Sequence, residues 1–347
     1  MNALQLSLAR SPEQFPFSLD PRSDLISFLH LTKSDFDAAS FLDARILTRQ
    51  TQLHSIPWQQ VATALESANL VERCNFIFHI GHVGSTLISR LIGAHPGVLA
   101  LREPMLLRTF AQVNSDPEVE LHWSDDDFNA RLTGALTLFS RTFDQRQLPI
   151  IKATSFVSEL SLGLMARAAA PRALMMFVSP ESYLATMMGG ENSRKEARML
   201  APFRLRRLHR RIGTEAWQGS SLSEGENLAL AWACEMSALT QAASAAGERA
   251  LWLNFDQFLA DPSRLLRIFH HLDIDAHEAQ VNAILGGPDM RRYSKAPEYA
   301  YDAALRAEVL NEARALHGEE IRRGLNWLEQ AAARFEPVRQ AMMMRSQ

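Results

Sequence analysis

A short loop between two apolar segments holds the residues best suited to binding an anion. It runs His82, Val83, Gly84, Ser85, Thr86 and Leu87, after the apolar run 76–80 and at the start of a helical pattern. Unpaired backbone N–H groups and the dipole at a helix N-terminus favour an anion there. Gly84 would let oxygen atoms approach the backbone closely, and Ser85 and Thr86 would add hydroxyl donors. The loop is therefore predicted to cradle a phosphate- or sulfate-bearing donor.

Two other interpretations of this loop stay open from the residues alone. Ser85 and Thr86 are good helix-start residues, so the loop could be an ordinary helix cap. A Walker A loop needs Gly-Lys-Ser/Thr, whereas Ser85 follows Gly84 directly. A lysine-dependent ATPase or GTPase is therefore disfavoured. An ATP-dependent phosphotransferase would also need a Mg²⁺-binding carboxylate, which the sequence does not mark.

Two charged residues follow apolar runs that are predicted to be strands. Glu103 comes shortly after an apolar run and precedes a proline, and Lys152 lies in the run 149–153. Ligands of open α/β sheets bind outside the carboxyl ends of the strands, so both side chains are expected there. Glu103 is the candidate general base, and Lys152 is a candidate cation for a phosphate. The alternatives are a surface glutamate paired with Arg102 or Arg108, and a lysine at a sheet edge.

The apolar periodicity predicts the elements that must position these residues. Strand candidates cover 76–80, 98–101, 149–153, 173–178 and 250–254, and helix candidates cover 87–94, 128–144, 157–169, 183–188 and 227–246. Strands that alternate with helices imply a parallel sheet covered on both faces. The expected fold class is a P-loop-like three-layer α/β/α domain with a central parallel sheet and helical N-terminal and C-terminal extensions.

The same pattern divides the chain into two parts. Residues 1–72 are expected to be a helical extension packed on the core, with helical patterns at 25–47 and 58–70 and no motif for chemistry. Residues 73–347 are expected to form the α/β domain, with an almost wholly helical part after residue 262.

Composition narrows the classes of function. The formal net charge of the 347 residues is −3, which argues against broad electrostatic binding to nucleic acid. Cys74 and Cys234 are too few for a disulfide framework and are expected to be buried free thiols. No apolar run of ~18 residues and no signal-peptide pattern is found, so we expect no membrane span and a cytoplasmic location. The histidine spacing matches no metal-ligand pattern, so no metal is expected.

The segment 76–104 resembles the donor-binding region of the sulfotransferase superfamily. After a strand, that region has a basic residue, a small residue, Gly-Ser/Thr-Thr, a helix, His-Pro and then Glu-Pro. The loop from His82, a His-Pro pair and Glu103-Pro stand at the matching places. The resemblance implies use of 3′-phosphoadenylyl sulfate (PAPS), with the loop on its 5′-phosphosulfate, Glu103 as the base and Lys152 near the phosphate. His82 stands where the family usually has Arg or Lys, so its charge at neutral pH is partial.

A second motif of the family is matched only in part. There a strand leads into Arg-Asp-Pro, with a Ser six residues after the proline, and the Arg and Ser bind the 3′-phosphate of PAPS. Aligned on the proline, Thr186 matches the Ser, whereas Val178 stands in place of the Arg. Other basic residues would have to serve. Arg292 and Lys295 lie where the family has a late basic loop, and the run 204–211 is the other candidate, although a solvated basic face is its simpler interpretation.

The segment 251–262 resembles the late strand and turn of the same family, which bears on the fold rather than on catalysis. In patches, the resemblance covers 76–272. The function that it implies is transfer of a sulfuryl group from PAPS to a hydroxyl or amine of a small-molecule or glycan acceptor. An ATP-dependent P-loop phosphotransferase and a non-catalytic nucleotide-binding member of the fold are the alternatives.

Overall fold

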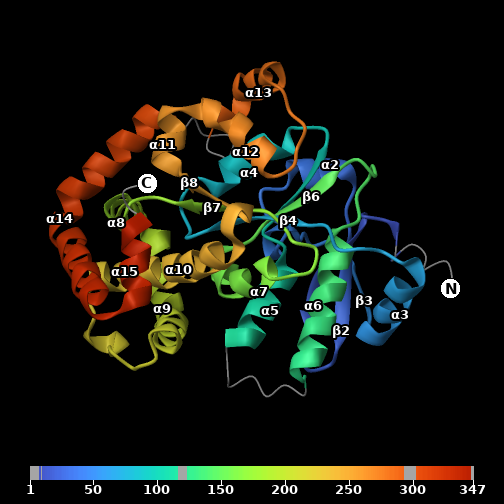
Figure 1. Cartoon of the computed structure of the whole chain (residues 1–347), viewed down its shortest axis with the longest axis horizontal. Helices are drawn as coiled ribbons and strands as arrows, with labels where there is room; N and C mark the ends of the chain where they lie inside the picture. Colours follow the sequence, from blue (N-terminus) through green and yellow to red (C-terminus); the bar gives the residue numbers. More distant parts are fainter. Residues whose placement is uncertain (1–7, 9, 116–122, 293–301, 345–347) are drawn as a thin grey trace.

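Among the residues that the structure describes, the central element is a five-stranded parallel sheet (Figure 1). The computed structural model describes residues 8, 10–115, 123–292 and 302–344. The strands are β4 (Asn75–His79), β5 (Val98–Arg102), β6 (Leu148–Lys152), β7 (Ala173–Phe177) and β8 (Ala250–Asn254), in the order β5-β6-β4-β7-β8. All neighbours pair in parallel. The carboxyl ends of β4, β5 and β6 therefore meet at one edge of the sheet.

The strands form because short, mostly apolar runs are covered on both faces. Every residue of β4, β5 and β7 is buried. Figure 1 shows α4 (Ser85–Gly93) and α12 (Leu265–His271) on one side of the sheet, and α6 (Asp125–Phe139) and α10 (Glu224–Ala246) on the other. The fold is a three-layer α/β/α arrangement, which confirms the fold class predicted from the alternating runs.

The remaining helices connect and extend these layers. They are α2 (Lys33–Ala38), α3 (Trp58–Ala68), α5 (Met105–Ser115), α7 (Ser161–Met165), α8 (Pro180–Gly189), α9 (Glu191–Ile212), α11 (Phe255–Ala260), α13 (Glu278–Leu285), α14 (Ala303–Arg334) and α15 (Glu336–Met343). Short 3₁₀ helices include η1 (Ala44–Ile46), η2 (Ser155–Leu160) and η6 (Pro288–Arg291). The single helix predicted over 157–169 is in fact η2 followed by α7. Within the described ranges, no helix has the length and apolarity needed to cross a membrane.

The expectation of a helical N-terminal extension is wrong for much of residues 1–72. A three-stranded antiparallel sheet lies there, made of β1 (Gln14–Asp20), β2 (Leu25–His30) and β3 (Leu53–Pro57) in that order. α2 and η1 lie between β2 and β3, and α3 follows β3. The correction applies to 25–47, where a strand replaces the start of the expected helix.

The residues of β1 explain the correction. Phe15, Phe17 and Leu19 are buried, and Ser18 and Asp20 are more exposed, as in a strand with one face on the core. Pro16 is buried as well, and the register of β1 with β2 shifts between Pro16 and Ser18, so the alternation is interrupted there. Pro16 lies between Phe15 and Phe17, and in a sequence a proline usually marks a loop or turn. A proline is tolerated here because β1 is an edge strand, where one side of the backbone has no sheet partner.

The C-terminal part is helical, as predicted. α14 packs along α8 and α10, and Figure 1 shows it as a long curved helix at the outer side of the molecule. Gly225 of α10 and Gly324 of α14 make the crossing possible, because a Cβ on either would strike backbone atoms of the other helix. At this crossing the backbones of α10 and α14 are in direct contact, with no side chain between them.

Candidate active site

The predicted anion-binding loop is a tight turn between β4 and α4. Its backbone φ angles are positive at Gly81 (+90°), His82 (+55°) and Gly84 (+66°). Gly84 is the N-cap residue of α4 and no side chain caps the helix, so Ser85 and Thr86 do not act as caps. Ser85 and Thr86 begin the helix and are buried, and the hydroxyl of Thr86 has no hydrogen-bond partner among the described residues. An uncapped helix start with an unused hydroxyl fits an anion.

Gly84 is also required by packing. A Cβ at this position would overlap the ring of Phe255, the first residue of α11. Arg306 of α14 lies over the same ring, with its guanidinium carbon 5.2 Å from the ring centroid. The Phe255 ring therefore occupies the space into which a side chain at position 84 would project. Donor oxygens can approach the Gly84 backbone closely only from its other sides.

Glu103 lies where the sequence predicted it, directly after β5, and the structure brings it to Lys152 at the end of β6. The Glu103 N–H donates to the Lys152 carbonyl oxygen at 2.7 Å, and φ of Glu103 is +54°. Non-glycine residues in this region of φ are strained and occur often at functional sites. The turn directs the Glu103 carboxylate back over the sheet edge, where Lys152 Nζ bonds to its Oε1 atom.

Two further side chains face the Glu103 carboxylate, the guanidinium of Arg45 and the imidazole of His79, and neither was predicted from the sequence. Arg45, in η1, places Nη2 3.2 Å from Oε2, and His79, the last residue of β4, places Nε2 4.0 Å from Oε1. Arg45 also lies over the ring of Phe41, 3.3 Å from its centroid. His79 had a usable signal, because it is a polar residue at the carboxyl end of a buried strand. Arg45 had none, because tertiary structure alone brings η1 to the sheet edge.

The electrostatics of the cluster favour an ionised Glu103. Burial by itself raises the pKa of a carboxyl group, but the interactions with Lys152, His79 and Arg45 outweigh burial and lower the pKa of Glu103 to about 2. The Glu103 side chain is 12% exposed and that of Lys152 is 0% exposed, so little water screens the pair. In this state Glu103 is charged at neutral pH but is a weak proton acceptor, because its cations stabilise the charge.

A cavity of about 750 Å³ opens beside Glu103. Glu103, His79 and the loop residues Gly81 and His82 form one part of its wall, and residues of η1, α5, η2 and α9 complete it. The His82 ring lies 3.5 Å from the Ser193 hydroxyl through Nδ1, and 3.8 Å from the Glu196 carboxylate through Nε2. His82 therefore faces the cavity from the loop, next to an acidic residue of α9.

The residues predicted for the far part of the donor site are not gathered into one group by any contact in the structure. Val178 is completely buried, and the Trp232 indole donates to its carbonyl oxygen at 3.3 Å. The Thr186 hydroxyl donates to the Ser182 carbonyl oxygen within α8, at 2.7 Å. Arg292 is exposed after η6, and Lys295 lies outside the described residues.

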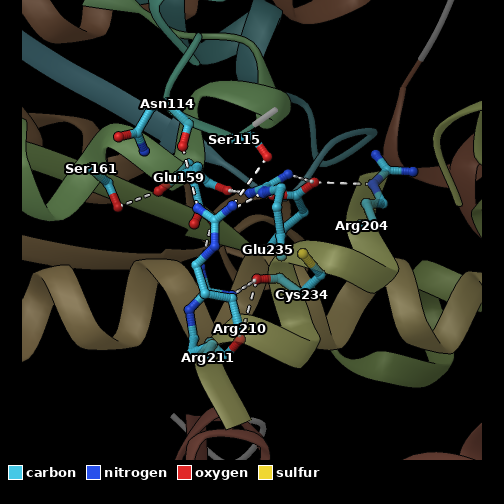
Figure 2. Close-up of polar contacts among 12 residues, drawn as sticks. Asn114, Ser115, Glu159, Ser161, Arg204, Arg210, Arg211, Cys234 and Glu235 are labelled. Carbon is cyan, nitrogen blue, oxygen red and sulfur yellow. Dashed lines mark hydrogen bonds and ion pairs between the residues drawn. The ribbon is translucent and has the colours of Figure 1, made fainter. Parts of the chain in front are cut away.

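The basic run 204–211 is a solvated face only in part, because Arg206 and Arg210 are exposed whereas Arg204 and Arg207 are buried. Arg204 and Arg207 converge on Glu235 of α10, which is completely buried. Figure 2 shows Arg204 and Glu235 of this cluster. Nε of Arg204 is 3.0 Å from Glu235 Oε1, and Nη2 of Arg207 is 2.8 Å from Oε2. Glu159 accepts from Arg207 and Arg211 at 2.9 and 2.6 Å. Arg204, Arg207 and Arg211 tie α9 to α10 and η2, so these three side chains are already engaged and do not replace the arginine that is missing at position 178.

The other residues with metal or redox potential do not form a site. Cys74 and Cys234 are buried free thiols, as predicted, and burial raises the pKa of Cys74 to about 12. Across the described part of the chain, no group of three or more His, Cys, Asp or Glu side chains is arranged to hold a metal ion.

Comparisons with known proteins agree with the sequence resemblance at the level of the fold. No family model matches the sequence, and no curated protein matches it. The solved structures that match include a sulfotransferase domain from the curacin biosynthetic pathway, with a TM-score of 0.42, 13% identity and coverage of 75% of this chain and 98% of that chain. A sulfotransferase domain from the Synechococcus PCC 7002 olefin synthase matches with a TM-score of 0.39, 13% identity and coverage of 74% and 95%.

A third match is a sulfotransferase from Alicyclobacillus acidocaldarius, with a TM-score of 0.36, 14% identity and coverage of 71% of this chain and 96% of that chain. All three are sulfotransferases, the superfamily that the motifs of the sequence resemble.

Proposed function

We propose that the protein is a sulfotransferase that transfers a sulfuryl group from PAPS to a hydroxyl or amine of an acceptor. The observation that carries the proposal is the meeting of Glu103 and Lys152 at the carboxyl end of the parallel sheet. The anion-binding loop, which follows the neighbouring strand β4, and the cavity lie at the same edge. A base, a cation and an anion-binding helix start are the parts that transfer of an anionic group requires.

The donor fits the loop and Lys152 by charge. The uncapped start of α4 and the hydroxyls of Ser85 and Thr86 would hold the phosphosulfate oxygens. Lys152 would face the bridging oxygen, on which negative charge grows as the sulfuryl group leaves. His82 would add a hydrogen-bond donor from the loop, and Thr186, Arg292 and Lys295 are proposed to lie nearer the nucleotide.

The chemistry would use Glu103 as the base. The acceptor oxygen or nitrogen attacks sulfur, its proton passes to the Glu103 carboxylate, and the bond from sulfur to the bridging oxygen breaks. The electron pair of that bond stays on the phosphate of the product, adenosine 3′,5′-bisphosphate (PAP). If Lys152 turns from Glu103 to this phosphate, Glu103 loses its strongest cation and its pKa rises. The base would thus become effective only with a donor in place.

The cavity sets the size of the acceptor that can reach Glu103. Its volume of about 750 Å³ is in the range of small-molecule sites and admits one or two sugar rings. Charged and apolar residues both line it, including Arg108 and Phe156. A small-molecule or glycan acceptor is therefore the class that we propose.

The test is calorimetric titration of the purified protein with PAP, with ATP and Mg²⁺ as the competing ligand. Micromolar binding of PAP that is lost in Lys152→Ala, or in the double variant Ser85→Ala/Thr86→Ala, is the expected result. Circular dichroism and thermal unfolding of each variant control for folding. If folded wild-type protein does not bind PAP, the proposal is wrong. Binding of ATP with Mg²⁺ would then favour a phosphotransferase, and binding of neither would favour a non-catalytic member of the fold.

A further inference from the structure

His79 joins the anion-binding loop to Glu103, and no motif assigned it a role. Its Nδ1 atom accepts a hydrogen bond from the Gly81 backbone N–H at 3.0 Å. Its Nε2 atom faces Glu103 Oε1 at 4.0 Å. The ring is 5% exposed and lies at the end of β4, the middle strand of the sheet. One imidazole therefore contacts the loop with one nitrogen and the candidate base with the other.

The contact with Gly81 fixes which nitrogen carries the proton. A backbone N–H can only donate, so Nδ1 must accept and is unprotonated. The neutral ring then carries its hydrogen on Nε2, the atom that faces the carboxylate. A proton on Nδ1 would break the contact with the loop. The loop geometry thus sets the His79 tautomer in which an N–H points at Glu103.

We propose that His79 is a positioning residue that holds the Glu103 carboxylate in place when Lys152 turns to the donor. This inference rests on the proposed function. Without Lys152, the carboxylate would lose its bond at Oε1 and keep the Arg45 contact at Oε2. A movement of about 1 Å would then bring Oε1 within hydrogen-bond distance of Nε2–H. Contacts of this kind are often long before the substrate binds and shorten in the reactive complex.

A neutral N–H suits this task better than a second full charge. A charged partner stabilises the carboxylate strongly and makes it a poor base, whereas a neutral donor orients it with a smaller effect on its pKa. Burial of the ring and its bond to Gly81 hold the imidazole rigid, so the position of Glu103 is fixed relative to the donor loop. Occupation of the loop and orientation of the base are thereby coupled through a single side chain.

Two substitutions separate the two contacts of His79. In His79→Asn, the amide oxygen can replace Nδ1 as the acceptor for Gly81, but nothing reaches Glu103. In His79→Gln, the longer amide can reach towards Glu103, but the loop contact is lost. We expect His79→Asn to bind PAP within about twofold of wild type and to slow sulfuryl transfer by about 10- to 100-fold, the size of effect that misplacement of a reacting group produces. The KM for the acceptor should stay nearly unchanged. His79→Gln should mainly weaken PAP binding.

Two NMR measurements need no acceptor. In wild-type protein labelled with ¹⁵N-histidine, His79 should carry its hydrogen on Nε2, and a hydrogen on Nδ1 would overturn the inference. In protein labelled with ¹³C at the glutamate carboxyls, with Glu103→Gln to assign the signal, the pKa of Glu103 should be higher in Lys152→Met/His79→Asn than in Lys152→Met, because the carboxylate can move to Nε2–H once Lys152 is gone. Identical Glu103 titrations in these two variants would also overturn the inference.

These outcomes are distinguishable from failure of the proposed function. If wild-type protein does not bind PAP, the sulfotransferase proposal fails, while the tautomer and the Glu103 titration still report on the contacts of His79. If PAP binds and both His79 variants lose affinity and rate to the same extent, His79 is a packing residue of the loop, and the inference is wrong. If neither variant folds, the tautomer in the wild-type protein decides.

Discussion

Two carboxylates in this molecule are each surrounded by cations, and they differ in what lies around them. Glu235 is held by Arg204 and Arg207 in the layer of helices below the sheet, and all three side chains are at most 3% exposed (Figure 2). Glu103 is held by Lys152 and Arg45 at the sheet edge, and the Arg45 side chain is 54% exposed. The first cluster is closed by α9, α10 and η2, whereas the second faces a cavity of about 750 Å³.

The backbone marks the same difference. Glu235 lies in the middle of a regular helix, where its position costs no strain. Glu103 has a φ of +54°, in a region that non-glycine residues rarely adopt. The pKa of both carboxyl groups is lowered. In each case burial opposes ionisation, and the neighbouring cations outweigh burial. The neighbouring charges therefore do not distinguish a structural carboxylate from a candidate base. The features that distinguish Glu103 are the cavity beside it and its strained backbone.

The largest effect is expected from Glu235→Ala. This change leaves two buried guanidinium groups without their carboxylate, and breaking a buried pair in this way costs ~3–5 kcal/mol of the free energy of unfolding. Denaturation in urea measures it. Reaction of Cys234 with a thiol reagent, slow in the native protein because the thiol is buried, should become faster in the variant. A loss below about 1 kcal/mol would mean that the cluster is not structural.

The next largest effect is expected from changing glutamate to glutamine, and the same change at Glu103 and at Glu235 allows the two sites to be compared directly. Glu103→Gln should slow sulfuryl transfer by roughly 100-fold or more, because the base is lost, and should leave PAP affinity nearly intact. Glu235→Gln is the matched control and should lower the free energy of unfolding without changing PAP affinity. Steady-state kinetics and calorimetry measure the two outcomes. Unchanged turnover in Glu103→Gln would remove this residue from the mechanism.

A smaller effect is expected in acid. The folded-state pKa of Glu103 is lowered from 4.5 to about 2, so its ion pairs stabilise the fold fully above pH 4.5. That contribution is lost as the pH falls through about 2. The stability difference between wild type and Glu103→Gln should therefore shrink over this range. Urea denaturation of both proteins at several pH values tests it, and a difference that stays constant down to pH 2 would contradict the lowered pKa.

The smallest effect is expected from Arg45→Ala. Because the Arg45 side chain is half-exposed, its pairs with Asp43 and Glu103 should contribute only ~0.2–1 kcal/mol to the free energy of unfolding. The pKa of Glu103 should rise, since one of its cations is gone. Thermal unfolding and the Glu103 carboxyl titration measure both. A stability loss as large as that of Glu235→Ala would mean that the two clusters do not differ as described.

The parts of the fold that the sequence predicted are those with strong local signals. The strand runs are continuous and apolar, and the loop before α4 combines glycine with hydroxyl residues, so β4, β5, β6 and the turn were found near their observed bounds. Glu103 and Lys152 were placed at strand ends, and parallel pairing of β5 and β6 brings them together. Glu103 and Lys152 come into contact because β5 and β6 are parallel neighbours that end at the same level. The alternation of strands and helices in the sequence implies a parallel sheet of this kind.

The parts that were missed depend on contacts between distant segments. Leu208 of α9 is buried, as an apolar residue of a helix face should be, but Arg204 and Arg207 are buried beside it, because Glu235 lies opposite them. A single glutamate inside the apolar pattern of α10 was the available signal. The N-terminal sheet was missed because Pro16 interrupts the apolar run of β1, and the strand tolerates this proline at the sheet edge, next to a shift of register.

The candidate site has a consequence for the order of folding. The bond from Lys152 to Glu103 joins positions 49 residues apart, and the one from Arg45 to Glu103 joins positions 58 apart. Such contacts form only after long stretches of chain have been brought together, whereas the turns of α10 and α14 need only neighbouring residues. We expect the charge cluster to be among the late features to appear during refolding. Recovery of helical signal is therefore no measure of how much of the protein has regained a site.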